Sequence, residues 1–171
     1  MPNRGNIGFR PVEKPDLPLL HDWLSKPHVA KWWDPAEKAI RSIERHIGDD
    51  AVTPLMVCLD ESAFAYMQLC ELDVDRNEDN VPIECPVGTI GLDQFIGPED
   101  KVGIGLGPRF LKLITTKLFC EGTPAVLVDP DPSNLFAIRA YEKAGFNRLR
   151  QVDKKNGPTL FMVRTSQENP Q

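Results

Sequence analysis

The stretch from Leu92 to Gly107, which reads LDQFIGPEDKVGIGLG, constrains the fold more than any other part of the chain. An apolar run over residues 89–96 predicts a strand that ends at Gly97-Pro98. Three alternating glycines follow at positions 103, 105 and 107, and apolar residues then recur with helical spacing. The sequence therefore predicts a strand, a glycine loop and a helix, with Pro108 in the first helical turn.

The glycine loop has two interpretations. Glycines let backbone N–H groups converge, and a helix N-terminus carries partial positive charge, so the loop can form a cradle for an anion such as phosphate. The alternative is a tight turn that enters a helix, because GxGxG is a short pattern. The loop lacks the Lys-Ser/Thr ending of a P-loop and does not match GxGxxG, so a dinucleotide fold is not indicated.

Length and charge limit the function classes. A chain of 171 residues is expected to form one domain with a substantial core. Its net charge of −5 and pI near 5.2 disfavour nucleic acid as a partner and are compatible with a cationic small molecule. The first residues lack the apolar region of a signal peptide, and no run reaches the length of a membrane span. We therefore expect a cytoplasmic protein, monomeric or homodimeric, without a membrane partner.

Cysteine and histidine spacing gives no indication of a metal. The four cysteines show no CxxC pair, and the three histidines are scattered. We expect reduced thiols, mostly packed in strands and a helix, and no metal site.

Periodicity along the chain predicts an alternation of strands and helices. Asp16 can cap a helix that carries Leu17, Leu20 and Leu24 on one face. Further helices are expected at 36–47, from about 106 to Gly122, and at 134–144. Strands are expected at 6–11, 52–59, 63–71, 89–96, 125–128, 146–152 and 159–164, with a polar tail after Thr165. The order predicts an α/β fold, a mixed sheet with helices on both faces.

Two further stretches carry functional interest. Trp32 and Trp33 are adjacent and cannot both face one core on a helix, so one lines a surface or pocket, or both are buried against loops. Residues 71–84 are acidic and poor in apolar side chains, which predicts a loop. That loop is either solvated surface or attracts a polycation.

Three stretches together resemble the GCN5-related N-acetyltransferase (GNAT) superfamily. They are LDQFIGPEDKVGIGLGPRFLKLI, VLVDPDPSNLFAIRAYEKAGF and the hairpin VTPLMVCLDESAFAYMQLCEL. With HDWLSKPHVAKWWD added, the chain resembles the aminoglycoside 6'-N-acetyltransferase branch from about Phe9 to Arg164. The resemblance implies a single N-acetyltransferase domain over 1–171, with a core of about 7–165. It also implies a mostly antiparallel central sheet.

Some positions depart from the pattern of the superfamily. Val102, preceded by Lys101, stands where the loop usually begins with Gln or Arg, but the backbone would still bind the phosphates. The acidic loop lacks an aromatic pair expected of an aminoglycoside enzyme, which bears on the identity of the drug. A sister branch that acylates siderophore lysines tends to carry histidines where this chain has Leu92-Asp93, and this favours the aminoglycoside branch.

The resemblance implies two catalytic residues. Asp93 would hold and deprotonate the acceptor amine, and an Asp inside an apolar strand is out of place for structure alone, since strands are depleted in Asp. Its alternative is a surface residue at a strand end. Tyr141 would donate a proton to the departing CoA thiolate, and its alternative is a helix tyrosine packed against the sheet.

The resemblance also implies the residues that bind acetyl-CoA and the acceptor. Asn134 would bond the pantetheine amides, or it is a plain helix cap. The acceptor would be bordered by Gln68 with Trp32 or Trp33, beside Asp93. The expected acetyl-CoA contacts are Phe95, Ile96, Val102, Gly103, Ile104, Gly105, Leu106, Gly107, Asn134 and Ala137.

Three functions remain open. The leading hypothesis is an acetyl-CoA-dependent aminoglycoside 6'-N-acetyltransferase without a metal, hence an antibiotic-resistance enzyme. The second is acylation of another primary amine, such as a siderophore lysine arm, a polyamine or a protein amine. The third is a CoA-binding or sensor module that no longer catalyses, which the pair of Asp93 and Tyr141 argues against.

Overall fold

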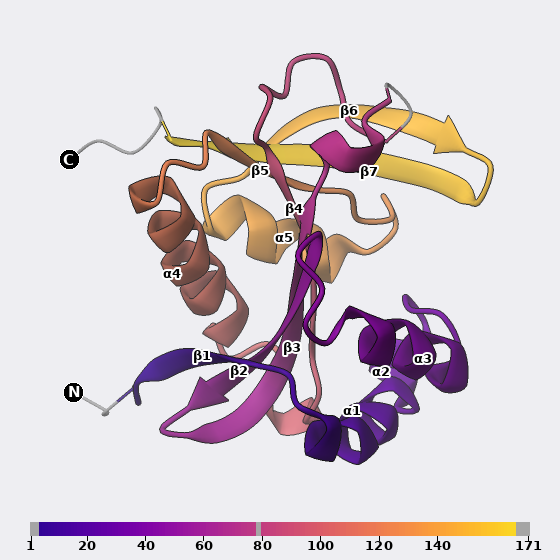
Figure 1. Cartoon of the computed structure of the whole chain (residues 1–171), viewed down its shortest axis with the longest axis vertical. Helices are drawn as coiled ribbons and strands as arrows, with labels where there is room; N and C mark the ends of the chain where they lie inside the picture. Colours follow the sequence, from indigo (N-terminus) through magenta and orange to yellow (C-terminus); the bar gives the residue numbers. More distant parts are fainter. Residues whose placement is uncertain (1–3, 78–79, 167–171) are drawn as a thin grey trace. The chain divides into compact units, whose positions relative to one another are not determined.

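A computed structural model describes residues 4–77 and 80–166 of the chain, and Figure 1 shows its elements in sequence order. Seven strands are hydrogen-bonded in the order β1-β2-β3-β4-β5-β7-β6. β1 pairs antiparallel with β2, and β7 pairs antiparallel with β5 and β6, while β4 and β5 run parallel. This mixed, mostly antiparallel sheet with its helices confirms the predicted α/β class.

The observed elements follow the predicted order. The strands are β1 (Ile7–Pro11), β2 (Val52–Leu59), β3 (Ser62–Glu71), β4 (Ile90–Ile96), β5 (Ala125–Val128), β6 (Asn147–Lys154) and β7 (Gly157–Thr165). The α-helices are α1 (Leu17–Leu24), α2 (Pro27–Ala30), α3 (Ala36–His46), α4 (Leu106–Cys120) and α5 (Leu135–Lys143). Three short 3-10 helices are η1 (Lys14–Asp16), η2 (Asp73–Asp75) and η3 (Glu99–Lys101).

Contacts divide the chain into two compact units. The first comprises the residues up to Leu69 together with Asp93–Ile104. The second comprises Cys70–Leu92 and the chain from Gly105 onward. The boundary between the two units passes through β3, β4 and the glycine loop.

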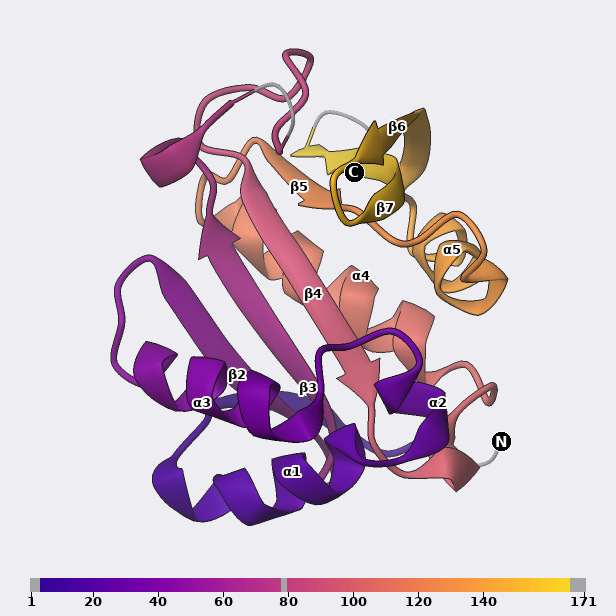
Figure 2. The same cartoon turned by 90° about the vertical axis from the view of Figure 1, so that its right-hand side faces the viewer.

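The first unit buries one apolar cluster beneath its helices. α1 and α3 lie side by side (Figure 2). Their inward residues include Leu20, Trp23 and Ile43, which are at most 3% exposed. These residues pack with side chains that alternate along the strands, such as Met56 and Cys58 of β2. The remaining buried members of the cluster are Val12, Leu24, Val29, Ala36, Ala39, Tyr66 and Phe95.

The hairpin between β2 and β3 turns on two residues rather than the three expected. Asp60 has φ 46° and Glu61 has φ 72°, so both are left-handed. Two consecutive positive φ values are those of the tight turn that matches the right-handed twist of the strands. The Asp60 carboxylate also accepts the Asn6 amide at 2.8 Å, which ties the turn to the start of β1.

Two predictions about the first unit are corrected. The Asp16 side chain does not cap α1, because it binds Arg10 and the Glu13 amide instead. The sequence analysis also did not predict α2, a helix of four residues. A helix this short has too few apolar positions to show a period.

The second unit surrounds a fully buried β5, as predicted. Every residue of β5 is buried, and its Leu127 packs with Phe161 of β7 and with Val81 and Cys85 of the preceding segment. α4 also packs on α5 and is joined to β7, since Arg164 donates to the Thr115 hydroxyl.

Three expectations in the second unit need correction or lie outside the described residues. Leu113, one of the apolar residues that recur with helical spacing after the glycines, lies outside the core and is 47% exposed. The acidic segment is not only solvated loop, because it contains η2 and buries Val81. Its Glu78 and Asp79, and the tail after Ser166, lie outside the described residues.

Candidate functional site

Asp93 of β4 accepts a hydrogen bond from the neighbouring strand. Gln68 of β3 donates from Nε2 to Asp93 Oδ2 at 3.0 Å. The Oε1 atom of the same amide accepts the Tyr66 hydroxyl at 2.8 Å. Tyr66 and Gln68 are two residues apart on one strand, so their side chains share a face of the sheet. The three residues therefore form a hydrogen-bonded chain that ends on a carboxylate.

An aromatic cluster holds the buried end of this chain. Tyr66 is fully buried, and its ring lies 5.3 Å from that of Phe95 and 5.9 Å from that of Trp33. Trp33 also meets Phe95 edge to face at 5.0 Å. Trp33 thus packs on the core of the first unit, whereas Trp32 is half-buried with the Lys31 ammonium 4.8 Å from its ring.

The end of β4 is fixed by two contacts from the first unit. His28 Nε2 lies 3.0 Å from the Ile96 carbonyl oxygen, which it reaches as a donor. The Gly97 amide donates to the Phe64 carbonyl at 2.9 Å. A Cβ on Gly97 would lie 2.0 Å from the Trp23 ring, so only glycine fits there. These contacts set the direction in which the chain leaves β4 for the glycine loop.

The glycine loop has the geometry of a helix entry. η3 comes first, and the Val102 amide donates to the Glu99 carbonyl at 3.2 Å. Gly103 and Gly105 have φ of 78° and 87°, values that only glycine adopts readily. Gly105 is the N-terminal cap of the fifteen-residue α4, and a Cβ built on it meets nothing within 4 Å. The space around that Cβ position is open, and an anion at this helix N-terminus would face backbone amides.

The predicted residues of α5 lie together in the second unit. Asn134 Oδ1 accepts the Ala137 amide at 3.2 Å, so Asn134 caps the helix, which was the alternative to cofactor binding. Tyr141 is 5% exposed, and its ring lies 5.5 Å from that of Phe146. The Tyr141 ring therefore packs against Phe146, and this packing restrains the position of the Tyr141 hydroxyl.

Sequence reasoning did not identify Asp129, which follows β5 directly. Burial raises the pKa of Asp129, although 45% of its side-chain surface is exposed, and the Lys154 ammonium at 3.6 Å opposes the shift. An acidic residue at the end of a fully buried strand is the signal that could have singled it out, but Asp129 opens the stretch DPDPS, whose composition is that of a turn.

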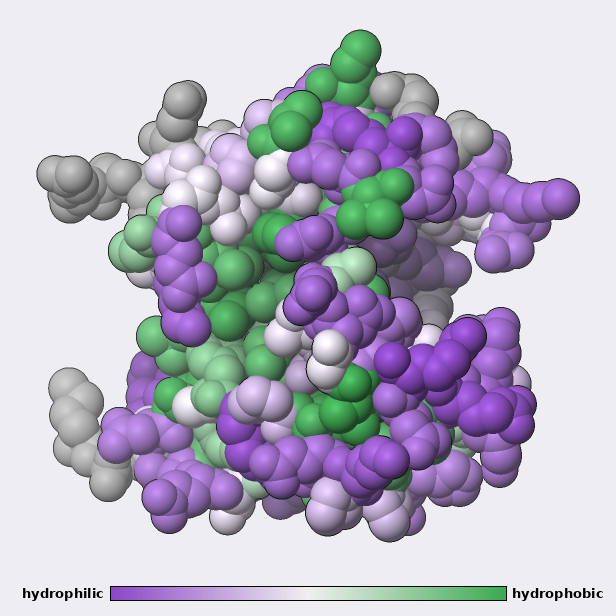
Figure 3. Space-filling view, viewed as in Figure 1, coloured by the Kyte–Doolittle hydropathy of each residue, from purple (hydrophilic) through white to green (hydrophobic). Residues whose placement is uncertain are grey.

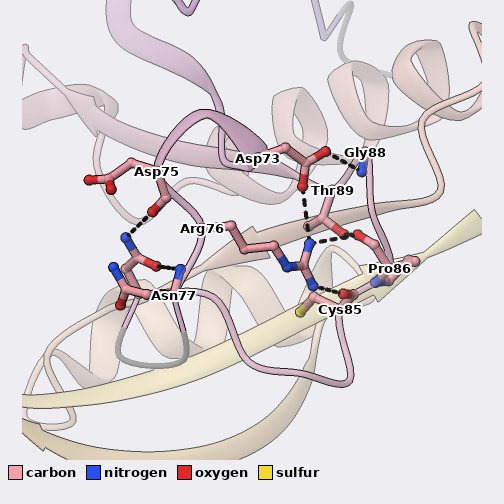
Figure 4. Close-up of polar contacts among 9 residues, drawn as sticks. Asp73, Asp75, Arg76, Asn77, Cys85, Pro86, Gly88 and Thr89 are labelled. Carbon is pink, nitrogen blue, oxygen red and sulfur yellow. Dashed lines mark hydrogen bonds and ion pairs between the residues drawn. The ribbon is translucent and has the colours of Figure 1, made fainter.

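The segment between η2 and β4 is held by polar contacts (Figure 4). The Arg76 guanidinium donates to the Asp73 carboxylate and to the carbonyl oxygens of Cys85 and Pro86. Asp73 also accepts the Gly88 amide at 2.7 Å. These contacts hold the described residues on both sides of positions 78 and 79.

Described residues of the same segment are also bonded to β6 and carry exposed apolar side chains. Glu84 forms a bidentate ion pair with Arg150, in which Nη1 donates to Oε1 at 2.5 Å and Nη2 donates to Oε2 at 3.0 Å. Val74, Ile83 and Val87 are each more than 70% exposed. Hydrophobic side chains at the tip of the segment appear in green at the top of Figure 3.

Within residues 4–77 and 80–166, no group of three or more His, Cys, Asp or Glu side chains could hold a metal ion. The same residues include no helix that is both long and apolar enough to cross a membrane. Cys58 and Cys85 are buried, the latter in a loop rather than a strand or helix, and Cys120 is exposed.

The sequence matches the model of the acetyltransferase (GNAT) domain over residues 13–154. The chain therefore belongs to the GNAT family and is an acetyltransferase. It is 29% identical over 170 residues to an aminoglycoside N(6')-acetyltransferase type 1 from Klebsiella pneumoniae, covering 95% of this chain and 84% of the relative. A lysine N-acyltransferase from Mycobacterium tuberculosis is 26% identical over 87% of this chain and 72% of its own length.

The similarity to solved structures extends over nearly the whole chain. The aminoglycoside acetyltransferase AAC(6')-Ib in complex with coenzyme A and kanamycin superposes with a TM-score of 0.80 and 30% identity. The match covers 95% of this chain and 96% of that one.

Proposed function

We propose that the protein transfers the acetyl group of acetyl-CoA to the 6'-amine of aminoglycosides. The observation that carries the proposal is the carboxylate of Asp93, held by Gln68 on β4, the strand that leads into the glycine loop. The similarity to AAC(6')-Ib, solved with coenzyme A and kanamycin, supports both substrates. The family match over residues 13–154 supports a single N-acetyltransferase domain, which would act in the cytoplasm, where acetyl-CoA is supplied.

The residues present fit acetyl-CoA. Open space above Gly105, at the N-terminus of α4, suits the pyrophosphate, because helix amides and the helix dipole attract anions. The backbone of Phe95 and Ile96, the amides of Gly103–Gly107 and the side chain of Asn134 would contact the rest of the molecule. Bound acetyl-CoA supplies the thioester whose acetyl group is transferred.

The acceptor amine must lose a proton before it can attack. An amine with a pKa near that of lysine, about 10.4, costs about 4–5 kcal/mol to deprotonate at pH 7. Asp93 would hold the ammonium by charge and accept that proton, directly or through a water. The new C–N bond forms as the C–S bond breaks. Tyr141 would donate its hydroxyl proton to the departing sulfur, and the proton left on the nitrogen passes to solvent.

A second candidate is acylation of a lysine side chain. The relative from Mycobacterium tuberculosis, a lysine N-acyltransferase, favours it, and the same Asp93 chemistry would serve. The two candidates differ only in the acceptor.

A panel of amines with acetyl-CoA, followed by thiol release, tests the proposal. Kanamycin and tobramycin, which carry a primary 6'-amine, should be acetylated. Paromomycin has a hydroxyl at that position and gentamicin C1 a methylated amine, so both should be poor acceptors. Nα-blocked lysine and spermidine represent the alternative acceptors. Turnover of these two without turnover of kanamycin would overturn the aminoglycoside proposal and favour the alternative.

A further inference from the structure

We propose that Tyr66 and Gln68 are positioning residues that set the orientation of Asp93 for proton transfer. This inference rests on the proposed function, because it concerns the same carboxylate. The chain of hydrogen bonds runs from the Tyr66 hydroxyl through the Gln68 amide to Asp93 Oδ2, at 2.8 and 3.0 Å. The family resemblance implied instead that Gln68 borders the acceptor.

The donor direction in this chain is fixed by chemistry. An ionised carboxylate only accepts hydrogen bonds, so the Gln68 group that faces Asp93 must be the NH₂ end. The carbonyl end then faces Tyr66, whose hydroxyl is a donor. A flipped amide would set its oxygen against the carboxylate. The carboxylate therefore selects the amide orientation, and the Tyr66 hydroxyl, which can donate or accept, donates to the Oε1 atom that faces it and anchors the amide in that orientation.

Burial makes Tyr66 a rigid anchor. Its ring is fully buried between Trp33 and Phe95, with ring centroids 5.9 and 5.3 Å away. Gln68 and Asp93, in contrast, are only partly buried. A hydroxyl that cannot move thus constrains a more exposed amide and, through it, a carboxylate. Catalysis depends on this kind of support, because a general base must stay within hydrogen-bond reach of the proton.

The aromatic cluster connects this chain to the end of β4. Phe95 contacts Tyr66 and lies two residues after Asp93, on the same face of β4. Trp33 contacts both rings. The side chain of Trp33 therefore acts on the site through Tyr66, by holding its ring, which differs from a direct role in binding the acceptor.

The test compares Tyr66→Phe with Gln68→Leu in steady-state acetylation of kanamycin. Tyr66→Phe keeps the ring packing and removes only the hydroxyl, and kcat should fall about three- to tenfold, the weight of one hydrogen bond. The KM for acetyl-CoA should stay within about twofold, because no acetyl-CoA contact is changed. Gln68→Leu should lower kcat by about tenfold or more, since Asp93 loses the donor itself.

Double variants show whether the two residues act in series. Adding Tyr66→Phe to Gln68→Leu should cause no further loss of kcat, because the relay is already broken. In an Asp93→Asn background, neither substitution should matter. Gln151→Leu, the same change on the exposed face of β6, is the control and should leave kcat unaltered.

Two results would overturn the inference. Additive losses in the double variant would mean that Tyr66 acts through general packing, and the melting temperature would then fall with kcat. A rise in the KM for kanamycin with Gln68→Leu, with no effect of Tyr66→Phe, would place Gln68 against the acceptor. If the unmutated protein does not acetylate kanamycin at all, the proposed function fails first, so the two failures are distinguishable.

Discussion

At the residue scale, the carboxylate of Asp16 holds the segment between β1 and α1. Its Oδ2 accepts Arg10 Nη1 at 2.7 Å and the Glu13 amide at 2.9 Å, and its Oδ1 accepts Arg10 Nη2 at 2.7 Å. The hydrogen bond from Arg10 is the main reason that the pKa of Asp16 is lowered. A carboxyl whose pKa is lower in the folded state stabilises the fold above its unfolded pKa, and this stabilisation is lost as the pH falls through the folded pKa.

Asp16→Asn should therefore destabilise the protein at neutral pH and not in acid. We expect a loss of about 1–2 kcal/mol at pH 7, because Arg10 remains partly exposed and solvent screens the pair. The difference in unfolding free energy from the parent should shrink towards zero near about pH 2. Urea unfolding at both pH values measures it.

Asp34→Asn is the matched control for Asp16→Asn. Asp34 pairs with Lys38 at 3.2 Å, but both side chains are more than half exposed, so the change should stay within about 0.5 kcal/mol. An Asp16→Asn deficit that is as large in acid as at pH 7 would show that shape, not charge, makes the contribution.

Individual residues of the candidate site were predictable when they broke a local rule. Asp93 stood out because a carboxylate is unusual inside an apolar strand, and it lies on β4 as expected. The hydrogen bond from Gln68 to Asp93 was not predictable, since pairing between β3 and β4 decides which side chains of the two strands meet. Asp129 was missed because it is the first residue of the stretch DPDPS, whose residue types are common in turns.

At the element scale, the glycine loop and α4 are continuous, because the last residue of the loop, Gly105, is the N-cap of the helix. Gly105 is left-handed and caps the helix, and a Cβ there would meet only open space. Any substitution at this position therefore acts through backbone strain and through what enters that space. Asn and Asp have nearly the same shape, and both tolerate the left-handed region better than other non-glycine residues. Comparing the two substitutions at Gly105 therefore separates the effect of backbone strain from that of charge.

Gly105→Asp should weaken acetyl-CoA binding more than Gly105→Asn does. Both variants should lose about 1 kcal/mol of stability, the cost of a side chain at positive φ. The negative charge in Gly105→Asp would face the pyrophosphate, so its KM for acetyl-CoA should exceed that of Gly105→Asn by about tenfold or more. Equal KM values in two folded variants would mean that phosphate does not bind at this helix N-terminus.

Helices and strands were predictable where the hydrophobic period agreed with the residues that bound the element. β5 lies at the predicted residues because four apolar residues stand between Pro124 and Asp129. α2 was missed because four residues show no helical period. Arg76 also donates to the carbonyl oxygens of Cys85 and Pro86, nine and ten residues away, and no local pattern in the sequence shows such contacts.

At the scale of the whole molecule, membership of the GNAT family accounts for both the fold class and the acetyltransferase activity. The GNAT match spans residues 13–154 and includes every element from α1 to β6. The net charge of −5 suits a polycationic acceptor, although charge alone identifies no substrate. The sequence could predict the fold class and reaction, whereas the supporting contacts of Asp93 required the structure.

Acetylation of kanamycin by the parent and by Asp93→Asn, measured side by side as thiol release, tests the central claim most directly. Asn keeps the shape of Asp93 and removes its charge and basicity. We predict turnover by the parent and a fall of about 10²-fold or more in the variant, the range for a general base. Saturating acetyl-CoA should still raise the melting temperature of both proteins, since about 2.7 kcal/mol of stabilisation follows at a hundredfold excess over Kd. Acetylation by Asp93→Asn at the parent rate, with acetyl-CoA bound, would contradict the account.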